Sequence, residues 1–335
     1  MELKPTLFDA ARRDGYILDA MARHRVPGLA AAALRSGQMA GLWHYGVADE
    51  AGNPVGDDTV FEAASLTKTL FACLVLRLWE GGTLDLDAPM AALRPEPGLS
   101  QDPRLAAITP RQTLCHATGL PNWGAKPLPF HFDPGHGFGY SGEGYYYLQR
   151  LVEQLAGEAL PALFKRHFFT PWAMAESSGI WHSGLKMAHG FNHAGAVCRI
   201  RDSVDLTGNA PEPNAAWSLY TSAQDYAQYI GRLLRGEVGL RPETLAAMAA
   251  PQNSADEHIA WGLGWGLVKT HPGLLWHWGS NTGFQSAVTL HRGNGDGLVL
   301  MTNSDNGVAF TLELLQYFTG EGCFEHIGAF IEKAE

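Results

Sequence analysis

The residues best suited to chemistry are a serine and a lysine three positions apart, Ser65 and Lys68, at the start of an apolar segment. On a helix this spacing places both side chains on one face, within contact distance. A lysine that is withdrawn from water can be neutral and can accept the proton of a serine hydroxyl. The N-terminus of a helix adds backbone N–H groups that stabilise negative charge. We therefore interpret this turn as a candidate nucleophile, its base and part of an oxyanion site.

A second pair with the same spacing, Ser183 and Lys186, shows that the motif alone decides little. Ser183 is followed by Gly184 and by no apolar helical stripe, so we expect a loop there. Ser65 is instead followed by apolar residues at helical spacing, which predicts a buried helix with the serine in its first turn. These apolar residues are Leu70, Phe71, Leu74, Val75 and Leu78.

Two further segments could complete a site with Ser65. Tyr140 lies in a loop just before an expected helix, where a tyrosine on a cleft wall could relay protons. His277 lies at the edge of an expected C-terminal strand, and the small residues after it would let the backbone approach an acyl group. Three tryptophans could line an acyl pocket or could be ordinary core residues, namely Trp123, Trp261 and Trp278. His116 is expected to be a structural hydrogen-bonding residue.

In this order the motifs resemble those of the serine β-lactamase and penicillin-binding-protein superfamily. The similarity is greatest to its class C-like branch of esterases and D-peptidases, in which Tyr-x-Asn and often His-x-Gly accompany Ser-x-x-Lys. Three flanking segments are also similar to family segments, and the resemblance runs from about residue 25 to residue 305. The flanking segments are Leu114–Pro121, Tyr220–Asp225 and Trp261–Trp265.

The resemblance implies a role for each residue of the constellation. Ser65 would attack a carbonyl group and form an acyl-enzyme, Lys68 would help to activate it, and Tyr140 would be the second proton-transfer group. His277 would take the place of the family lysine. The backbone N–H groups of Ser65 and Ser280 would form the oxyanion hole, in which one donor typically contributes ~3 kcal/mol to catalysis.

The sequence departs from the family pattern at two positions that concern the substrate. Gly142 stands where the family often has asparagine, a side chain that commonly helps to hold the lysine and the substrate amide. His277 is a poorer anchor for a substrate carboxylate than lysine. Both changes favour an ester or a neutral amide over a penicillin. Further substrate contacts are expected from Gly279, Trp278, Asn281 and Trp123.

The elements that must position these residues form an α+β pattern, with strands near both ends of the chain and helices between them. Strands are expected at 28–34, 39–47, 264–269, 285–291 and 298–303, and terminal helices at 5–24 and 308–318. We expect a β-lactamase/transpeptidase-like fold with an antiparallel sheet flanked by terminal helices. Residues 1–64 and 211–335 would form the sheet domain, and residues 65–210 a large, mainly helical domain. The site would lie in the cleft between them.

Composition excludes several classes of partner. The net charge of −10 leaves no basic stripe for nucleic acid or for an anionic membrane surface. The four cysteines form no Cys-x-x-Cys pair and are expected to be free thiols. The segment after Met1 lacks the pattern of a signal peptide, and no stretch is apolar enough to span a bilayer, so we expect a cytoplasmic protein.

No cofactor and no metal are expected. Several histidines fall in irregular segments without a recognised ligand pattern, namely His131, His136, His182, His189 and His193. The absence of Gly-x-Ser-x-Gly and of a P-loop argues against an α/β-hydrolase and against a P-loop ATPase. The sequence does not fix the oligomeric state.

These observations predict a serine hydrolase that cleaves a small ester through an acyl-enzyme on Ser65. A D-peptidase, an amidase or a weak β-lactamase is the alternative within the same chemistry. An acyltransferase would use the same residues, and the sequence does not separate it from a hydrolase. A relative that only binds or senses acyl compounds is the non-enzymatic alternative, against which the intact Ser65, Lys68 and Tyr140 argue.

Overall fold

The computed structural model describes residues 1–201 and 212–334, which contain nine α-helices and twelve strands. The helices are α1 Ala10–His24, α2 Thr67–Glu80, α3 Pro110–Leu114, α4 Gly142–Ala156, α5 Leu160–Phe164, α6 Ala223–Arg235, α7 Pro242–Met248, α8 Gly307–Thr319 and α9 Phe324–Ala334. The strands are β1 Gly28–Arg35, β2 Gln38–Gly46, β3 Phe61–Ala64, β4 Gly190–Phe191, β5 Val197–Arg199, β6 Leu219–Thr221, β7 Asn253–Ser254, β8 Ile259–Trp261, β9 Gly266–Val268, β10 Leu274–Asn281, β11 Phe284–His291 and β12 Asp296–Thr302.

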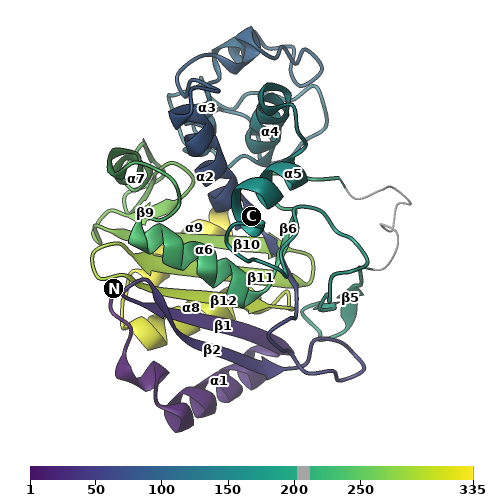
Figure 1. Cartoon of the computed structure of the whole chain (residues 1–335), viewed down its shortest axis with the longest axis vertical. Coiled ribbons are helices and arrows are strands. Elements are labelled where there is room, and N and C mark those ends of the chain that lie inside the picture. The colour runs from purple at the N-terminus through teal and green to yellow at the C-terminus, as the bar shows by residue number, and fades with distance from the viewer. Residues whose placement is uncertain (202–211, 335) are drawn as a thin grey trace.

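The two ends of the chain meet in one antiparallel sheet, as expected. Within the described residues this sheet has eight strands in the order β2-β1-β12-β11-β10-β9-β8-β7. The N-terminal hairpin joins the C-terminal strands through β1 and β12, with Ala31 opposite Leu300. Figure 1 shows α6 across one face of the sheet and α8 behind the other, with α1 beside α8. The expected α+β arrangement of sheet and terminal helices is confirmed.

Strand β1 is rich in alanine, which has a low intrinsic preference for strands. Its residues alternate between two separate cores on the two faces of the sheet. Ala30 and Ala32 belong to the core that α6 covers, whereas Ala31 and Ala33 belong to the core of the terminal helices. The small side chains let helices pack closely on both faces, so burial on both sides outweighs the weak strand preference.

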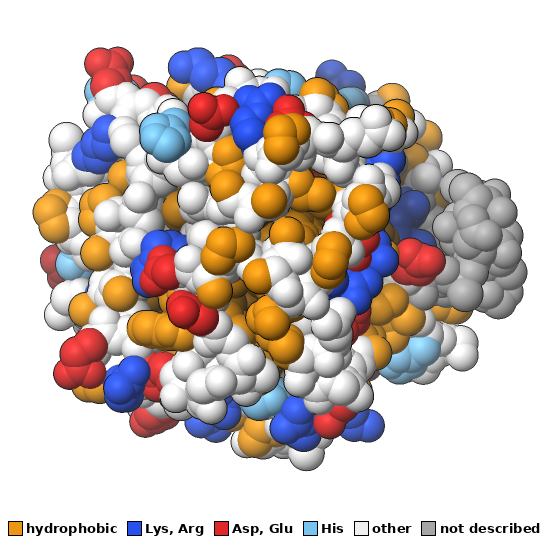
Figure 2. Space-filling model, turned by 90° about the horizontal axis from the view of Figure 1, so that it is seen from above, with side chains coloured by type: hydrophobic (Ala, Val, Ile, Leu, Met, Phe, Trp, Pro, Cys, Tyr) orange, Lys and Arg blue, Asp and Glu red, His pale blue; other side chains and the backbone are white. Residues whose placement is uncertain are grey.

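The helical part of the chain lies at one end of the sheet and is built around α2 (Figure 1). This helix is apolar all round, and its residues Leu70–Leu76 have no solvent-exposed surface. Strand β3, just before it, pairs with β6 outside the main sheet. Seen from above, hydrophobic side chains spread over the middle of the helical end, and most charged ones lie toward its rim (Figure 2). The predicted domain boundary at residues 210 and 211 lies outside the described residues.

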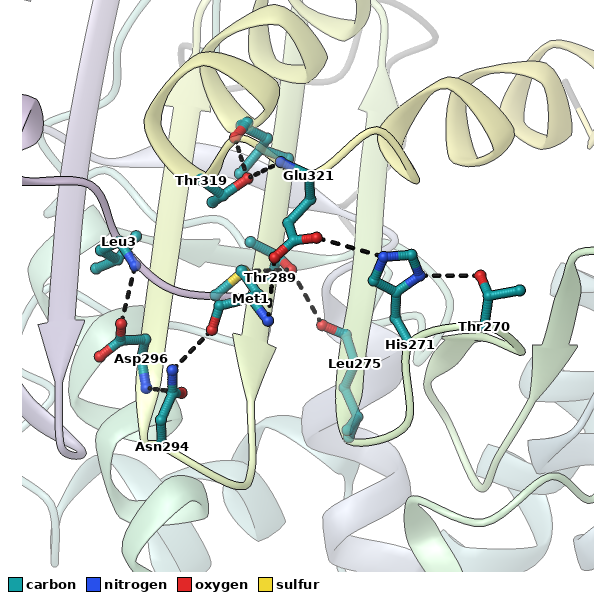
Figure 3. Close-up of polar contacts among 11 residues, drawn as sticks. Met1, Leu3, Thr270, His271, Leu275, Thr289, Asn294, Asp296, Thr319 and Glu321 are labelled. Carbon is teal, nitrogen blue, oxygen red and sulfur yellow. Dashed lines mark hydrogen bonds and ion pairs between the residues drawn. The ribbon is translucent and has the colours of Figure 1, made fainter.

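The start of the chain is tied to the sheet by polar contacts, which Figure 3 shows in close-up. The Leu3 N–H donates to Asp296 at 2.9 Å, and Asn294 donates to the Met1 carbonyl at 2.7 Å. The Met1 amino group lies 3.3 Å from a carboxylate oxygen of Glu321, in the turn between α8 and α9. Helix α9 itself was not predicted from the sequence.

The cysteines are free thiols, as expected: three are buried and Cys198 is partly exposed. In the part of the chain that the structure describes, no helix combines the length and hydropathy that crossing a bilayer would require.

Candidate active site

The chain makes a sharp turn between β3 and α2, and Ser65 lies in that turn. Ala64 has a φ of 49°, a left-handed conformation that is unfavourable for alanine and often marks functional sites. Helix α2 begins only at Thr67, so the prediction that the serine belongs to the first helical turn was wrong by two residues. The Thr67 hydroxyl donates to the Ala64 carbonyl at 2.6 Å and so stabilises the turn. Ser65 is thereby presented, partly exposed, at the N-terminal end of α2.

Ser65 and Lys68 are in hydrogen-bond contact. The Lys68 Nζ lies 3.0 Å from the Ser65 Oγ and 2.9 Å from the carbonyl oxygen of Ala216. The lysine is 1% exposed, and burial holds its pKa well below the usual value. In the described residues no carboxylate forms an ion pair with this amine, so no opposite charge offsets the effect of burial. A neutral amine at this distance can accept the serine proton.

Tyr140 lies against this lysine, on the loop that leads into α4. The Lys68 Nζ is 4.7 Å from the centre of the Tyr140 ring. The next residue, Ser141, caps α4 through its side chain, and its N–H donates to the His116 Nδ1 at 3.1 Å. The His116 ring also packs on the Tyr140 ring with 4.2 Å between centroids. The expected structural role of His116 is thus confirmed, since it fixes the backbone and the ring of this loop.

His277 lies in β10 with its side chain fully buried. Its Nδ1 lies 2.7 Å from the Trp278 carbonyl oxygen, and only a protonated nitrogen can donate to a carbonyl. The Nδ1 therefore carries the proton, and Nε2 carries a lone pair. Burial, and next the nearby Lys68 amine, lower the pKa of His277 to about 3. The imidazole is neutral at physiological pH and cannot act as a cationic anchor.

The end of β10 presents a backbone N–H on the side away from β11, and its residue Ser280 lines the same cavity as Ser65. Strands β10 and β11 are joined by a two-residue hairpin, so Asn281 and Phe284 form the hydrogen-bonded closing pair. Ser280 and Gln285 then form a pair without ladder bonds, and the Ser280 N–H points away from β11. On that side β9 pairs with β10 only at Leu275 and Trp276. The Ser280 N–H therefore faces the opening beyond the end of β9.

Gly279 allows β10 to approach the strand that precedes Ser65. A side-chain carbon at position 279 would lie only 2.2 Å from the carbonyl oxygen of Ala63 on β3. Any residue larger than glycine would push the two strands apart. The glycine thus serves the packing of β10 on β3, and the expected approach of this backbone to an acyl group stays a prediction.

A cavity of about 500 Å³ joins these groups. It contains most of the predicted site residues, whereas His277 and Gly279 lie behind its wall. Trp261 is fully buried and packs against His116 and Trp276, so of the two alternatives the ordinary core residue holds for it. The lining residues are Ser65, Lys68, Asn122, Trp123, Tyr140, Arg199, Trp217, Trp278, Ser280, Asn281, Thr282 and Ala334.

A buried carboxylate lies at the edge of this cavity and holds three side chains. Glu62, on β3, is 1% exposed, and its Oε1 accepts from Arg199 and Arg201 at 2.9 Å each. Its Oε2 accepts from the Asn281 Nδ2 at 2.7 Å. The side-chain amide of Asn281, predicted to bind substrate, is therefore bound within the protein. Arg199 lines the cavity, although its position in an irregular segment gave no sequence signal.

The loop between α3 and α4 supplies two more lining residues, Asn122 and Trp123. Sequence reasoning identified Trp123 and missed Asn122. A side-chain carbon at position 142 would lie 2.3 Å from the Trp123 ring, so the indole fills the space that an asparagine would occupy in place of Gly142. Only the structure shows that Trp123 fills this space, because positions 123 and 142 are far apart in the sequence.

The remaining candidates lie elsewhere. Ser183 falls in a turn, as expected, and is not among the lining residues of the cavity. In the residues that the structure describes, no group of three or more histidine, cysteine or acidic side chains is placed to hold a metal ion.

Comparison with known proteins agrees with this geometry. Residues 13–317 match the family model described as Beta-lactamase. Esterase EstB of Burkholderia gladioli is 28% identical over 90% of this chain and 94% of its own length. Penicillin-binding protein 4 of Amycolatopsis lactamdurans is 25% identical over 94% of this chain and 88% of its own length.

Among solved structures, a class C β-lactamase superposes with a TM-score of 0.75 at 19% identity, over 92% of this chain and 95% of that one. This likeness supports the fold alone. The family match covers most of the chain, and the chain therefore belongs to the β-lactamase family of serine hydrolases and penicillin-binding proteins.

Proposed function

We propose that this protein hydrolyses small esters through an acyl-enzyme on Ser65. The observation that carries the proposal is the 3.0 Å contact between the Ser65 hydroxyl and a buried amine whose pKa is lowered by desolvation. A neutral amine is the form of lysine that can remove a serine proton. The cavity beside this pair is large enough for a small ester.

The proposed reaction has two halves. Lys68 takes the proton of Ser65, and the serine oxygen attacks the ester carbonyl, whose oxygen is stabilised by the N–H groups of Ser65 and Ser280. The C–O bond to the alcohol breaks, and the alcohol leaves with a proton delivered from the Lys68–Tyr140 side. A water molecule then gives a proton to the same side and attacks the acyl carbon. The bond from this carbon to the Ser65 oxygen breaks, the proton returns to that oxygen, and the carboxylic acid is released.

The preference for an ester follows from the charge at the site. The imidazole of His277 is neutral, with a pKa of about 3, so it supplies no positive charge for a substrate carboxylate. Position 142 carries no side chain to hold a substrate amide. Similarity to an enzyme named as an esterase over 90% of the chain supports the same choice.

A D-peptidase, amidase or weak β-lactamase activity is the second candidate, because Arg199 lines the cavity. Its Nε is bound to Glu62, and its other N–H groups could receive a carboxylate. Similarity to a penicillin-binding protein over 94% of the chain supports this alternative. Transfer of the acyl group to an alcohol would follow from the same acyl-enzyme.

The test is a substrate comparison between the wild type, Ser65→Ala and Ser183→Ala. We expect p-nitrophenyl acetate and butyrate to be hydrolysed by the wild type and by Ser183→Ala, and not by Ser65→Ala. A chromogenic cephalosporin and a D-alanyl anilide should be poorer substrates, as measured by kcat/KM. Efficient cleavage of the cephalosporin without cleavage of either ester would contradict the proposal.

A further inference from the structure

The side chain of Asn122 has one end fixed and the other end available. Its Oδ1 accepts a hydrogen bond from the N–H of Gly142 at 3.0 Å, at the first residue of α4. Its backbone carbonyl accepts from the N–H groups of Gly142 and Glu143 at 3.1 and 3.0 Å. The residue is thus held at the helix N-terminus, and its amide orientation is determined because only the oxygen can accept.

Asn122 borders the active-site cavity, and its Nδ2 group is the other end of this amide. Because the oxygen is bound on α4, the NH₂ group is the part of this side chain that is left for another partner. Asn122 lines the main cavity and also the neighbouring one that Phe138 and Phe330 border. Within the described residues, Nδ2 makes no hydrogen bond. It is a preoriented donor that a bound molecule can use.

The other amide in the cavity wall is already engaged. The Asn281 Nδ2 donates to the buried Glu62 carboxylate at 2.7 Å. Position 142 cannot supply an amide either, since Trp123 occupies that space. Asn122 and Trp123 are adjacent, so one loop segment both closes the space beside Gly142 and presents a replacement donor. Because NH₂ only donates, its partner on the substrate must be an acceptor oxygen.

We propose that Asn122 determines substrate specificity by donating from Nδ2 to a second carbonyl-type oxygen of the substrate, apart from the carbonyl that Ser65 attacks. The preferred substrate is then an ester with a further ketone, amide or ester oxygen. This oxygen could lie in the acyl part or in the alcohol part of the ester, and in both cases a carbonyl oxygen would lie beside Asn122. The inference rests on the proposed function, because its substrates are esters whose carbonyl carbon is attacked by Ser65.

The test compares matched ester pairs in the wild type and in Asn122→Asp. For the acyl part the pair is p-nitrophenyl 4-oxopentanoate and p-nitrophenyl pentanoate, which differ only in the ketone oxygen. For the alcohol part the pair is 4-acetamidophenyl acetate and 4-propylphenyl acetate. The aspartate keeps an acceptor for Gly142, and a carboxylate is favourable at a helix N-terminus, but it cannot donate. Each ratio of kcat/KM is compared between proteins, so intrinsic ester reactivity cancels.

We expect the wild type to prefer the carbonyl-bearing ester in one of the two pairs, and Asn122→Asp to lose about fivefold of that preference. The pair that responds assigns the oxygen to the acyl or to the alcohol part. The matched control is Asn192→Asp, whose Oδ1 also accepts from backbone N–H groups, those of Ala194 and Ala196, in an exposed turn. This variant should keep the wild-type ratios. Equal ratios in the wild type and Asn122→Asp for both pairs would overturn the proposal.

A binding measurement separates this inference from ester hydrolysis itself. (Acetamidomethyl)boronic acid and butylboronic acid both bond reversibly to an active-site serine without a hydrolytic step, and only the first carries an amide oxygen. If neither ester pair is hydrolysed but the first boronic acid binds more tightly in an Asn122-dependent manner, ester hydrolysis is wrong and the role of Asn122 stands. Equal binding of both boronic acids, or an equal loss of both in Asn122→Asp, overturns the role. Circular dichroism verifies that each variant is folded.

Discussion

The two walls of the active-site cavity are built in different ways. The wall formed by β3, α2 and β10 is buried and regular: Lys68 is 1% exposed and His277 is 1% exposed. The wall formed by Asn122 and Trp123, in the loop between α3 and α4, is irregular and open, and Trp123 is 48% exposed, whereas Tyr140 at the end of the same loop is buried and belongs to the first wall. The buried wall shifts pKa values through desolvation, as the lowered pKa of Lys68 and of His277 shows. The open wall cannot do this, and its side chains contribute contacts instead.

This difference assigns separate tasks to the two walls. Bond making and breaking need a dehydrated amine beside the serine, which only a packed element can provide. Selection among substrates needs side chains that meet the ligand, and loops on a rigid scaffold provide these. Variants in the buried wall should therefore lower turnover for every ester, whereas variants in the open wall should change the ranking of esters.

Replacing Lys68 should have the largest effect, because it removes the proposed base. We expect Lys68→Met to lower kcat/KM for every ester about 10³-fold, within the range for loss of a general base. The apolar methionine fits the buried position, so the variant should fold. Lys186→Met, in the second Ser-x-x-Lys pair, is the matched control. A loss of similar size in both variants would remove the distinction between the two pairs.

The pH dependence of hydrolysis tests the buried wall through the ionisation of Lys68. Burial lowers the pKa of Lys68, so the amine is neutral and active above that pKa and protonated and inactive below it. We expect kcat/KM to fall about tenfold per pH unit on the acidic side of a single ionisation and to be level above it. His277, with a pKa of about 3, should contribute no step near neutral pH. An acidic limb that persists unchanged in Lys68→Met would assign the ionisation to another group.

Gly279→Ala tests the close contact of β10 with β3. The added carbon would lie 2.2 Å from the Ala63 carbonyl oxygen, so the strands must separate and the Ser280 N–H must move from the serine. We expect a loss of about 1–3 kcal/mol in the free energy of unfolding and about tenfold in kcat for all esters. Gly322→Ala, where nothing lies within 4 Å, is the control. If Gly279→Ala keeps the kcat of the wild type, the proposed role of β10 in placing the Ser280 N–H would be contradicted.

Trp123→Ala should have the smallest effect and should depend on the substrate. Its indole lines the cavity but is half exposed, so we expect kcat/KM to fall about fivefold for p-nitrophenyl butyrate and less for the acetate. The exposed apolar Leu93, replaced by alanine, is the control.

Gly142→Asn should then be tolerated in the Trp123→Ala background better than in the wild type, as measured by thermal unfolding. If Gly142→Asn changes the unfolding temperature equally in both backgrounds, the conclusion that the Trp123 indole fills the space beside Gly142 would be contradicted.

The buried wall was also the more predictable from the sequence. The apolar stripe after Ser65 indicated α2, and Ser141 with Tyr140 indicated the entry to α4, because these signals are local in the chain. The exact start of α2 was missed, since Ala64 has a left-handed conformation that alanine does not prefer and that the hydrogen bond from the Thr67 hydroxyl to its carbonyl supports. Similarly, β1 was identified by its apolar run despite its alanines.

The other groups of the site could be predicted only in part. Asn122 and Arg199 lie in segments without periodicity, and their positions depend on contacts with Gly142 and Glu62, which are distant in the sequence. The Ala216 carbonyl that receives Lys68 is a backbone group, which no residue pattern indicates. The assignment of residues 1–64 with 211–335 and of 65–210 to two domains stays a prediction.

The most direct test of the proposed chemistry is the mass of the protein after reaction with a fluorophosphonate and, under rapid acid quench, with p-nitrophenyl butyrate. We expect one phosphonyl or one butyryl group on the peptide that contains Ser65, and no modification of Ser65→Ala. Modification of Ser183, or of no residue while the ester is being hydrolysed, would contradict an acyl-enzyme on Ser65.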